Sequence, residues 1–125
     1  MNKFLVVLNV INGILFIAIG LLWVISPYEA GANFGILEIS EGLGRSSLIG
    51  DVGSYFFCIG LMMILAAYTL RNIWFYAPAM LLGVTALFRV ISWAAHDATF
   101  ATQFIIIEIL LITLLLVTSK RMSSQ

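Results

Sequence analysis

Three charged side chains, Asp51, Arg89 and Glu108, interrupt the long apolar segments of this sequence. Each lies roughly 7–11 Å inside the end of its segment, counting about 1.5 Å per helical residue. An unpaired ionised side chain inside a membrane helix is costly, about 2.5–3.5 kcal/mol at the helix centre, so charges at a common depth are expected to pair. The sequence therefore predicts a buried cluster of Asp51, Arg89 and Glu108.

Further polar side chains recur near these charges at spacings of three and four residues, which place them on one face of a helix. One set comprises Thr85, Arg89, Ser92 and His96, and the other comprises Asp51, Ser54, Tyr55 and Cys58. We expect the two faces to line a cavity that opens to the outer side, with His96 and Asp97 at its mouth. The predicted polar or ligand-binding site consists of Asp51, Tyr55, Arg89, Ser92, His96, Asp97 and Glu108.

The charges of this cluster admit two interpretations. One arginine against two carboxylates leaves a net negative site, which a proton, a cation or a basic ligand would complete. Alternatively, Arg89 serves only to hold three helices together, because ion networks inside membranes also serve assembly. The sequence assigns no catalytic residue and no cofactor. We predict no metal site, because the single histidine, His96, belongs to no recognisable metal-binding motif.

The positioning elements are four apolar segments, at about 4–25, 48–70, 73–95 and 102–119. Each approaches the roughly 20 residues that a helix needs to cross a bilayer. The first segment is too long for the core of a signal peptide and is expected to be a span. Because backbone groups must be hydrogen-bonded internally in lipid, the prediction is an all-α fold: a four-helix transmembrane bundle in a single domain, 1–125.

The composition agrees with this class. Of the 125 residues, 62% are hydrophobic and 10% are charged, against about 45–50% and about 25% in soluble domains. A soluble globular enzyme is thereby excluded, because its surface could not be covered with polar groups. The formal net charge is zero, so nucleic acid is not expected as a partner.

The distribution of basic residues predicts the orientation. Lys3, Arg71, Lys120 and Arg121 fall on one side of the predicted membrane, and Arg45 is the one basic residue near the other. The positive-inside rule then places both termini in the cytoplasm. The outer loop, 27–45, is long enough to be either a functional cap on the membrane surface or a connector. The short connection at Arg71 makes the second and third spans an antiparallel hairpin.

Glycines predict how the first two spans pack. Gly13 and Gly20 are seven residues apart, as are Gly53 and Gly60, so each pair occupies one helical face. Small residues on such faces let helix backbones approach closely in lipid.

Several short motifs together resemble a known family. They are Ile25-Ser26-Pro27, Gly44-Arg45 leading into Asp51-Val52-Gly53, Gly60-Leu61, the segment Phe88-Arg89-Val90-Ile91-Ser92, His96-Asp97 and Glu108. The pattern resembles small bacterial four-span proteins of a DoxX-related domain of unknown function. The broader group includes a membrane subunit of a thiosulfate:quinone oxidoreductase, so the resemblance implies quinone-linked or accessory roles by analogy.

Three functional hypotheses follow. The first is an accessory or ligand-binding protein of the inner (plasma) membrane that holds a lipid or quinone in the outer half of the bilayer. The second is a membrane-embedded enzyme, a quinone-linked oxidoreductase subunit or an isomerase, which uses Asp51 or Glu108 for proton transfer. The third is a proton-coupled transporter, which four spans could form only as an oligomer. The expected partners are the bilayer, a lipid or quinone, and further copies or a larger membrane complex.

Overall fold

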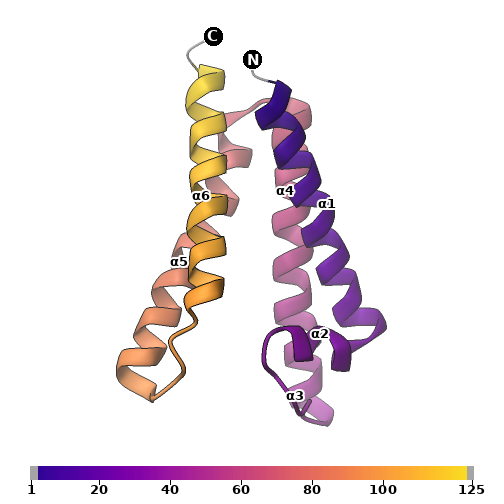
Figure 1. Ribbon diagram of the computed structural model, residues 1–125. Helices are drawn as coiled ribbons and strands as arrows, with labels where there is room; N and C mark the ends of the chain where they lie inside the picture. The colour runs from indigo at the N-terminus through magenta and orange to yellow at the C-terminus, as the bar shows by residue number, and fades with distance from the viewer. Residues whose placement is uncertain (1–2, 124–125) are drawn as a thin grey trace.

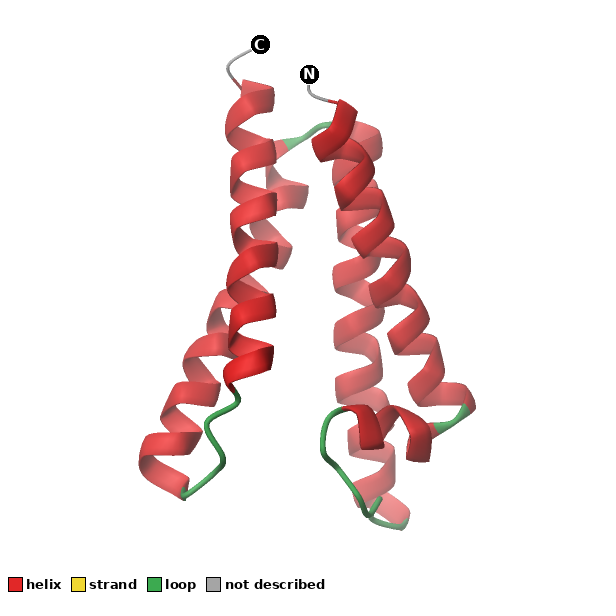
Figure 2. Cartoon of the chain, in the orientation of Figure 1, coloured by secondary structure: helices red, strands yellow, loops and turns green. Residues whose placement is uncertain are grey.

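A computed structural model describes residues 3–123, which are helical throughout except for short connections and contain no strand (Figure 2). The elements are α1 (Lys3–Ile25), α2 (Pro27–Asn33), α3 (Gly42–Ser47), a π-helical turn η1 (Leu48–Gly53), α4 (Ser54–Thr69), α5 (Asn72–His96) and α6 (Thr102–Ser123). The outermost residues of the predicted domain, 1–2 and 124–125, lie outside the described residues.

Four helical stretches are long and apolar enough to cross a membrane, namely Lys3–Ile25, Gly42–Thr69, Asn72–His96 and Thr102–Met122. They agree with the predicted spans except that the second begins earlier, because α3 and η1 continue directly into α4. This architecture is that of a small multi-pass integral membrane protein.

The predicted outer loop, 27–45, is largely helical. Pro27 occupies the first turn of α2, where its fixed backbone angle and missing N–H are tolerated. Only residues 34–41 separate α2 from α3 without helix. Ala30 and Ile39 are buried against Trp23 at the end of α1. The segment is therefore a packed cap on the bundle.

The four long helices form two antiparallel pairs, α1 with α4 and α5 with α6 (Figure 1). Both described ends of the chain lie at one end of the bundle, together with the connection at residues 70–71; we call this the termini end. The opposite, loop end carries α2, α3 and residues 97–101. As predicted, α4 and α5 form a hairpin, but they diverge from their connection toward the loop end, and each packs mainly on its other neighbour.

Glycines explain the close packing of α1 on α4. A Cβ atom at Gly13 would lie 2.8 Å from the carbonyl oxygen of Gly60, and one at Gly20 would lie 2.7 Å from that of Gly53. The backbones can therefore approach only because these positions have no side chain. The structure confirms the predicted glycine faces and shows that Gly13 of α1 opposes Gly60 of α4, and Gly20 of α1 opposes Gly53 at the end of η1.

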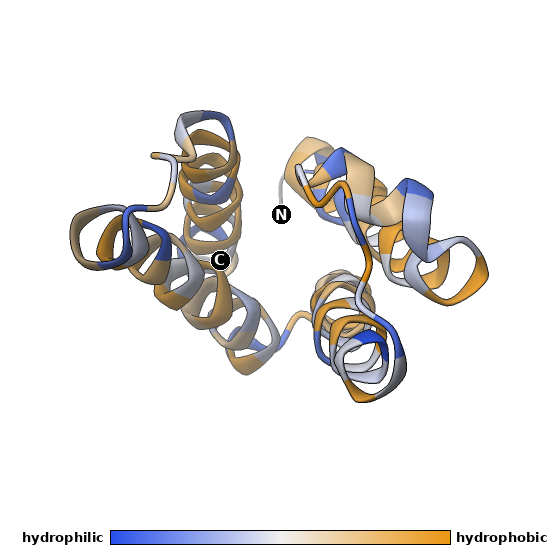
Figure 3. Ribbon diagram, turned by 90° about the horizontal axis from the view of Figure 1, so that it is seen from below, coloured by the Kyte–Doolittle hydropathy of each residue, from blue (hydrophilic) through white to orange (hydrophobic). Residues whose placement is uncertain are grey.

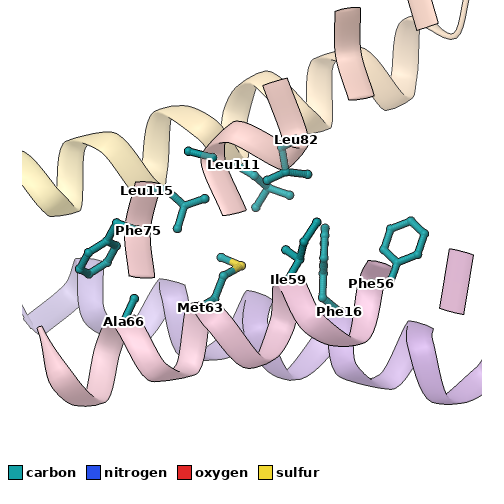
Figure 4. Close-up of a cluster of buried hydrophobic side chains, with 10 residues drawn as sticks. Phe16, Phe56, Ile59, Met63, Ala66, Phe75, Leu82, Leu111 and Leu115 are labelled. Carbon is teal, nitrogen blue, oxygen red and sulfur yellow. The ribbon is translucent and has the colours of Figure 1, made fainter. Parts of the chain in front are cut away.

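The apolar core runs along the face of α4 that points toward the other pair. Figure 4 shows Ile59 and Met63 on α4 facing Leu82 of α5 and Leu111 and Leu115 of α6. A second, smaller cluster of buried apolar residues, Trp23, Ala30 and Ile39, lies at the loop end. The view along the bundle shows the helices as two separate pairs (Figure 3).

Hydrogen bonds close the termini end. The buried Asn9 of α1 donates to Thr118 Oγ1 of α6 at 3.0 Å. Ser119 of α6 donates to Asn72 Oδ1, at the start of α5, at 2.9 Å. The first of these bonds joins the two helix pairs, and the second joins α5 to α6, both at the end opposite the predicted ligand site.

Candidate functional site

An ion pair between α5 and α6 forms the centre of the site. Arg89 Nε lies 3.2 Å from each carboxylate oxygen of Glu108. The Glu108 side chain is 8% exposed and that of Arg89 is 28% exposed. The two residues meet because they lie at similar distances from the connection between α5 and α6, at residues 97–101. The structure thus brings together two of the three charged residues singled out in the sequence.

The guanidinium of Arg89 retains unused donors. It lies over the ring of Phe104, with Cζ 4.9 Å from the ring centroid. Its hydrogen bonds to Glu108 both come from Nε. No residue between 3 and 123 accepts a hydrogen bond from Nη1 or Nη2. The planar fork that suits carboxylates, phosphates and carbonyl oxygens is therefore unoccupied.

Asp51 lies apart from this ion pair. It is exposed and lies in η1, and its carboxylate receives no hydrogen bond or ion pair from any described residue. The expectation of a buried three-residue cluster is therefore corrected to a buried pair with a separate carboxylate. Asp51 still lines the same cavity as Arg89, but α4 and α5 diverge toward the loop end, so the two side chains do not pair. Ser54 and Cys58 are likewise exposed.

Three neighbouring cavities meet at Arg89, which lines all of them; together we call them the loop-end cavity. Their volumes are about 390, 420 and 570 Å³. Thr85 lines the first and second, and Phe34 lines the first and third. Such volumes are typical of small-molecule sites.

The first of these cavities combines an apolar lining with a few polar groups. It is lined by Trp23, Phe34, Ile36, Asp51, Val52, Tyr55, Phe56, Thr85 and Arg89. The expected cavity between the second and third spans is therefore present, with Asp51 and Tyr55 contributed by one and Thr85 and Arg89 by the other.

A hydrogen bond joins the two polar faces. Tyr55 Oη lies 2.6 Å from Thr85 Oγ1. Thr85 uses its single hydroxyl proton to donate to the carbonyl oxygen of Leu81 at 2.8 Å. Tyr55 must therefore donate to Thr85. This contact fixes the tyrosine ring at the cavity wall and connects α4 to α5 part-way along the hairpin.

The remaining predicted residues lie further toward the loop end. Ser92 lines the second cavity. His96 is the exposed last residue of α5, and Asp97, also exposed, ends that helix with a φ of 57°. Within residues 3–123, no group of three or more histidine, cysteine or acidic side chains could hold a metal ion.

Sequence reasoning missed the aromatic part of the site. Phe34, which follows α2, stacks on Phe104 of α6 with ring centroids 5.4 Å apart, and lies 5.1 Å from the ring of Phe56. Trp23 is fully buried, and its indole Nε1 has no hydrogen-bond partner within the described part of the chain. The one signal in the sequence was Phe34 itself, an aromatic residue within the glycine-containing and partly polar outer loop, 27–45.

Comparisons of this chain with protein-family models, with curated proteins and with solved structures find no match.

Proposed function

We propose that this protein binds an amphipathic small molecule, a lipid or a quinone, in the loop-end cavity. The observation that carries the proposal is the unoccupied Nη1 and Nη2 fork of Arg89 at the place where three cavities meet. Buried or half-buried donors normally have acceptors, so a ligand oxygen is expected there. The aromatic and aliphatic lining offers room for an apolar portion of the same molecule.

Loss of the arginine fork provides the direct test. Arg89→Lys keeps a cation beside Glu108, so the bundle should remain folded, but an ammonium cannot make two parallel hydrogen bonds to one ligand group. We expect the amount of small molecule that co-purifies per protein to fall about tenfold. Native mass spectrometry of gently solubilised protein measures this amount.

The matched control is Arg71→Lys, the same change at an exposed position at the termini end. It should retain the ligand as the unchanged protein does. Equal retention in the Arg89→Lys variant, or no bound molecule in the unchanged protein, would contradict the proposal.

We further propose that the protein resides in the inner membrane with both termini in the cytoplasm. The support is the excess of basic residues at the termini end, which carries Lys3, Arg71, Lys120 and Arg121. The resemblance to DoxX-related proteins and the assembly of several copies or a larger membrane complex stay predictions.

Reporter fusions test this topology. A fusion after Arg71 and one after Gln125, which lies outside the described residues, should both be active as cytoplasmic green fluorescent protein. A fusion at Glu38 should be active as exported alkaline phosphatase. An exported carboxyl terminus would show that the orientation is wrong.

A further inference from the structure

The first cavity is lined by hydrogen-bond donors and by a hydrogen-bond acceptor that have no partner among the described residues. Together these groups limit the class of ligand. Donors without acceptors among the described residues are Nη1 and Nη2 of Arg89. A carboxylate without a donor, that of Asp51, lines the same cavity from η1. A ligand that satisfies all of them must accept hydrogen bonds at one point and donate at another.

The position of Asp51 indicates that the ligand group that donates to it carries a positive charge. The residue lies within the apolar stretch Gly42–Thr69, where an ionised side chain that faced lipid would be costly. No described residue supplies a cation to it; Arg45 is engaged with Tyr28 and with the carbonyl oxygen of Ser40. A primary ammonium would neutralise the carboxylate and donate hydrogen bonds to it.

Arg89 indicates which chemical group of the ligand accepts hydrogen bonds. A guanidinium fork binds phosphate oxygens through two parallel hydrogen bonds. Because Glu108 occupies only Nε, the fork remains available while the internal ion pair persists.

We therefore infer that the ligand is a lipid whose headgroup joins a phosphate to a primary ammonium, as in phosphatidylethanolamine. This inference rests on the proposed function and names its ligand class. A lipid, and not the free headgroup, is indicated by the apolar lining of Phe34, Ile36, Val52 and Phe56, which would contact acyl chains. A purely anionic lipid would leave Asp51 without a cation, and a trimethylammonium lipid would offer it no N–H donor.

Lipid selectivity tests the inference. The purified full-length protein is mixed with micelles that contain equal amounts of phosphatidylethanolamine, phosphatidylglycerol and phosphatidylcholine with identical acyl chains. Native mass spectrometry then counts each bound lipid. We expect the unchanged protein to prefer phosphatidylethanolamine over phosphatidylcholine by about fivefold, as for one net hydrogen bond of about 1 kcal/mol. Asp51→Asn should abolish this preference.

Glu38→Gln is the control, because it removes one exposed acidic charge at the same end of the molecule and Glu38 lines none of the three cavities. It should keep the preference. An unchanged preference in Asp51→Asn, or no preference in the unchanged protein, would overturn the inference. If Arg89→Lys still loses its bound molecules in that case, the proposed function stands.

A soluble competitor distinguishes the source of the headgroup. Glycerophosphoethanolamine carries the same phosphate and ammonium without acyl chains. We expect it to leave the bound lipid in place. Its displacement of the lipid at equal concentration would overturn the assignment of a membrane lipid.

Discussion

Replacing Gly20 with alanine is expected to destabilise the bundle by roughly 2 kcal/mol, the usual cost of overpacking a close contact. The added Cβ would lie 2.7 Å from both the carbonyl oxygen of Gly53 and the backbone nitrogen of Phe57. Neither atom can move without shifting α4 along or away from α1. Unfolding in mixed micelles, followed by tryptophan fluorescence, measures the loss.

Gly83→Ala is the matched control, since Gly83 also lies in a membrane-spanning helix. A Cβ there would meet only Ile112 Cδ1, at 3.8 Å, which is ordinary contact. This variant should be neutral or more stable by up to about 1 kcal/mol, because alanine favours helix over glycine. Similar unfolding free energies for the two variants would contradict the observed packing of α1 on α4.

The second large effect is expected at the ion pair between α5 and α6. Arg89→Leu leaves the carboxylate of Glu108, which is only 8% exposed, without its cation. Removing one partner of a buried pair costs about 3–5 kcal/mol, and the partial exposure of Arg89 favours the lower figure. Glu108→Leu should cost less, because the guanidinium still lies over Phe104 and reaches the cavity.

The double variant Arg89→Leu/Glu108→Leu separates pairing from packing. With both charges gone, two leucines can pack between the helices, so stability should recover much of the loss seen in Arg89→Leu alone. The unfolding free energies of the four proteins in delipidated micelles give the coupling. Additive losses in the double variant would show that the two side chains do not stabilise one another.

The helices and the glycine faces of the first two spans were predictable from the sequence, for physical reasons that single residues illustrate. A span is defined by length and apolarity, which require no knowledge of neighbours. Gly13 and Gly20 indicate a helix contact, because two glycines on one helical face are best explained by a neighbouring helix that packs closely there. The meeting of Arg89 with Glu108 followed similarly from their equal depth in consecutive spans.

The remaining features depend on geometry that residue types do not encode locally. The divergence of α4 from α5 toward the loop end separates Asp51 from Arg89, although both line one cavity. The stacking of Phe34 on Phe104 joins segments that are far apart in the chain. The angle between the two helix pairs results from the sum of many contacts, so no short motif predicts it.

The hydrogen bond between Asn9 and Thr118 has a mechanical consequence. It holds the two helix pairs together near the termini end, while the cavity lies between their opposite ends. A rotation of about 5° over the length of α5 would displace the loop end of that helix by about 3 Å. Such a widening of the cavity would also have to separate Tyr55 from Thr85 and Phe34 from Phe104, because these contacts join the two pairs closer to the cavity.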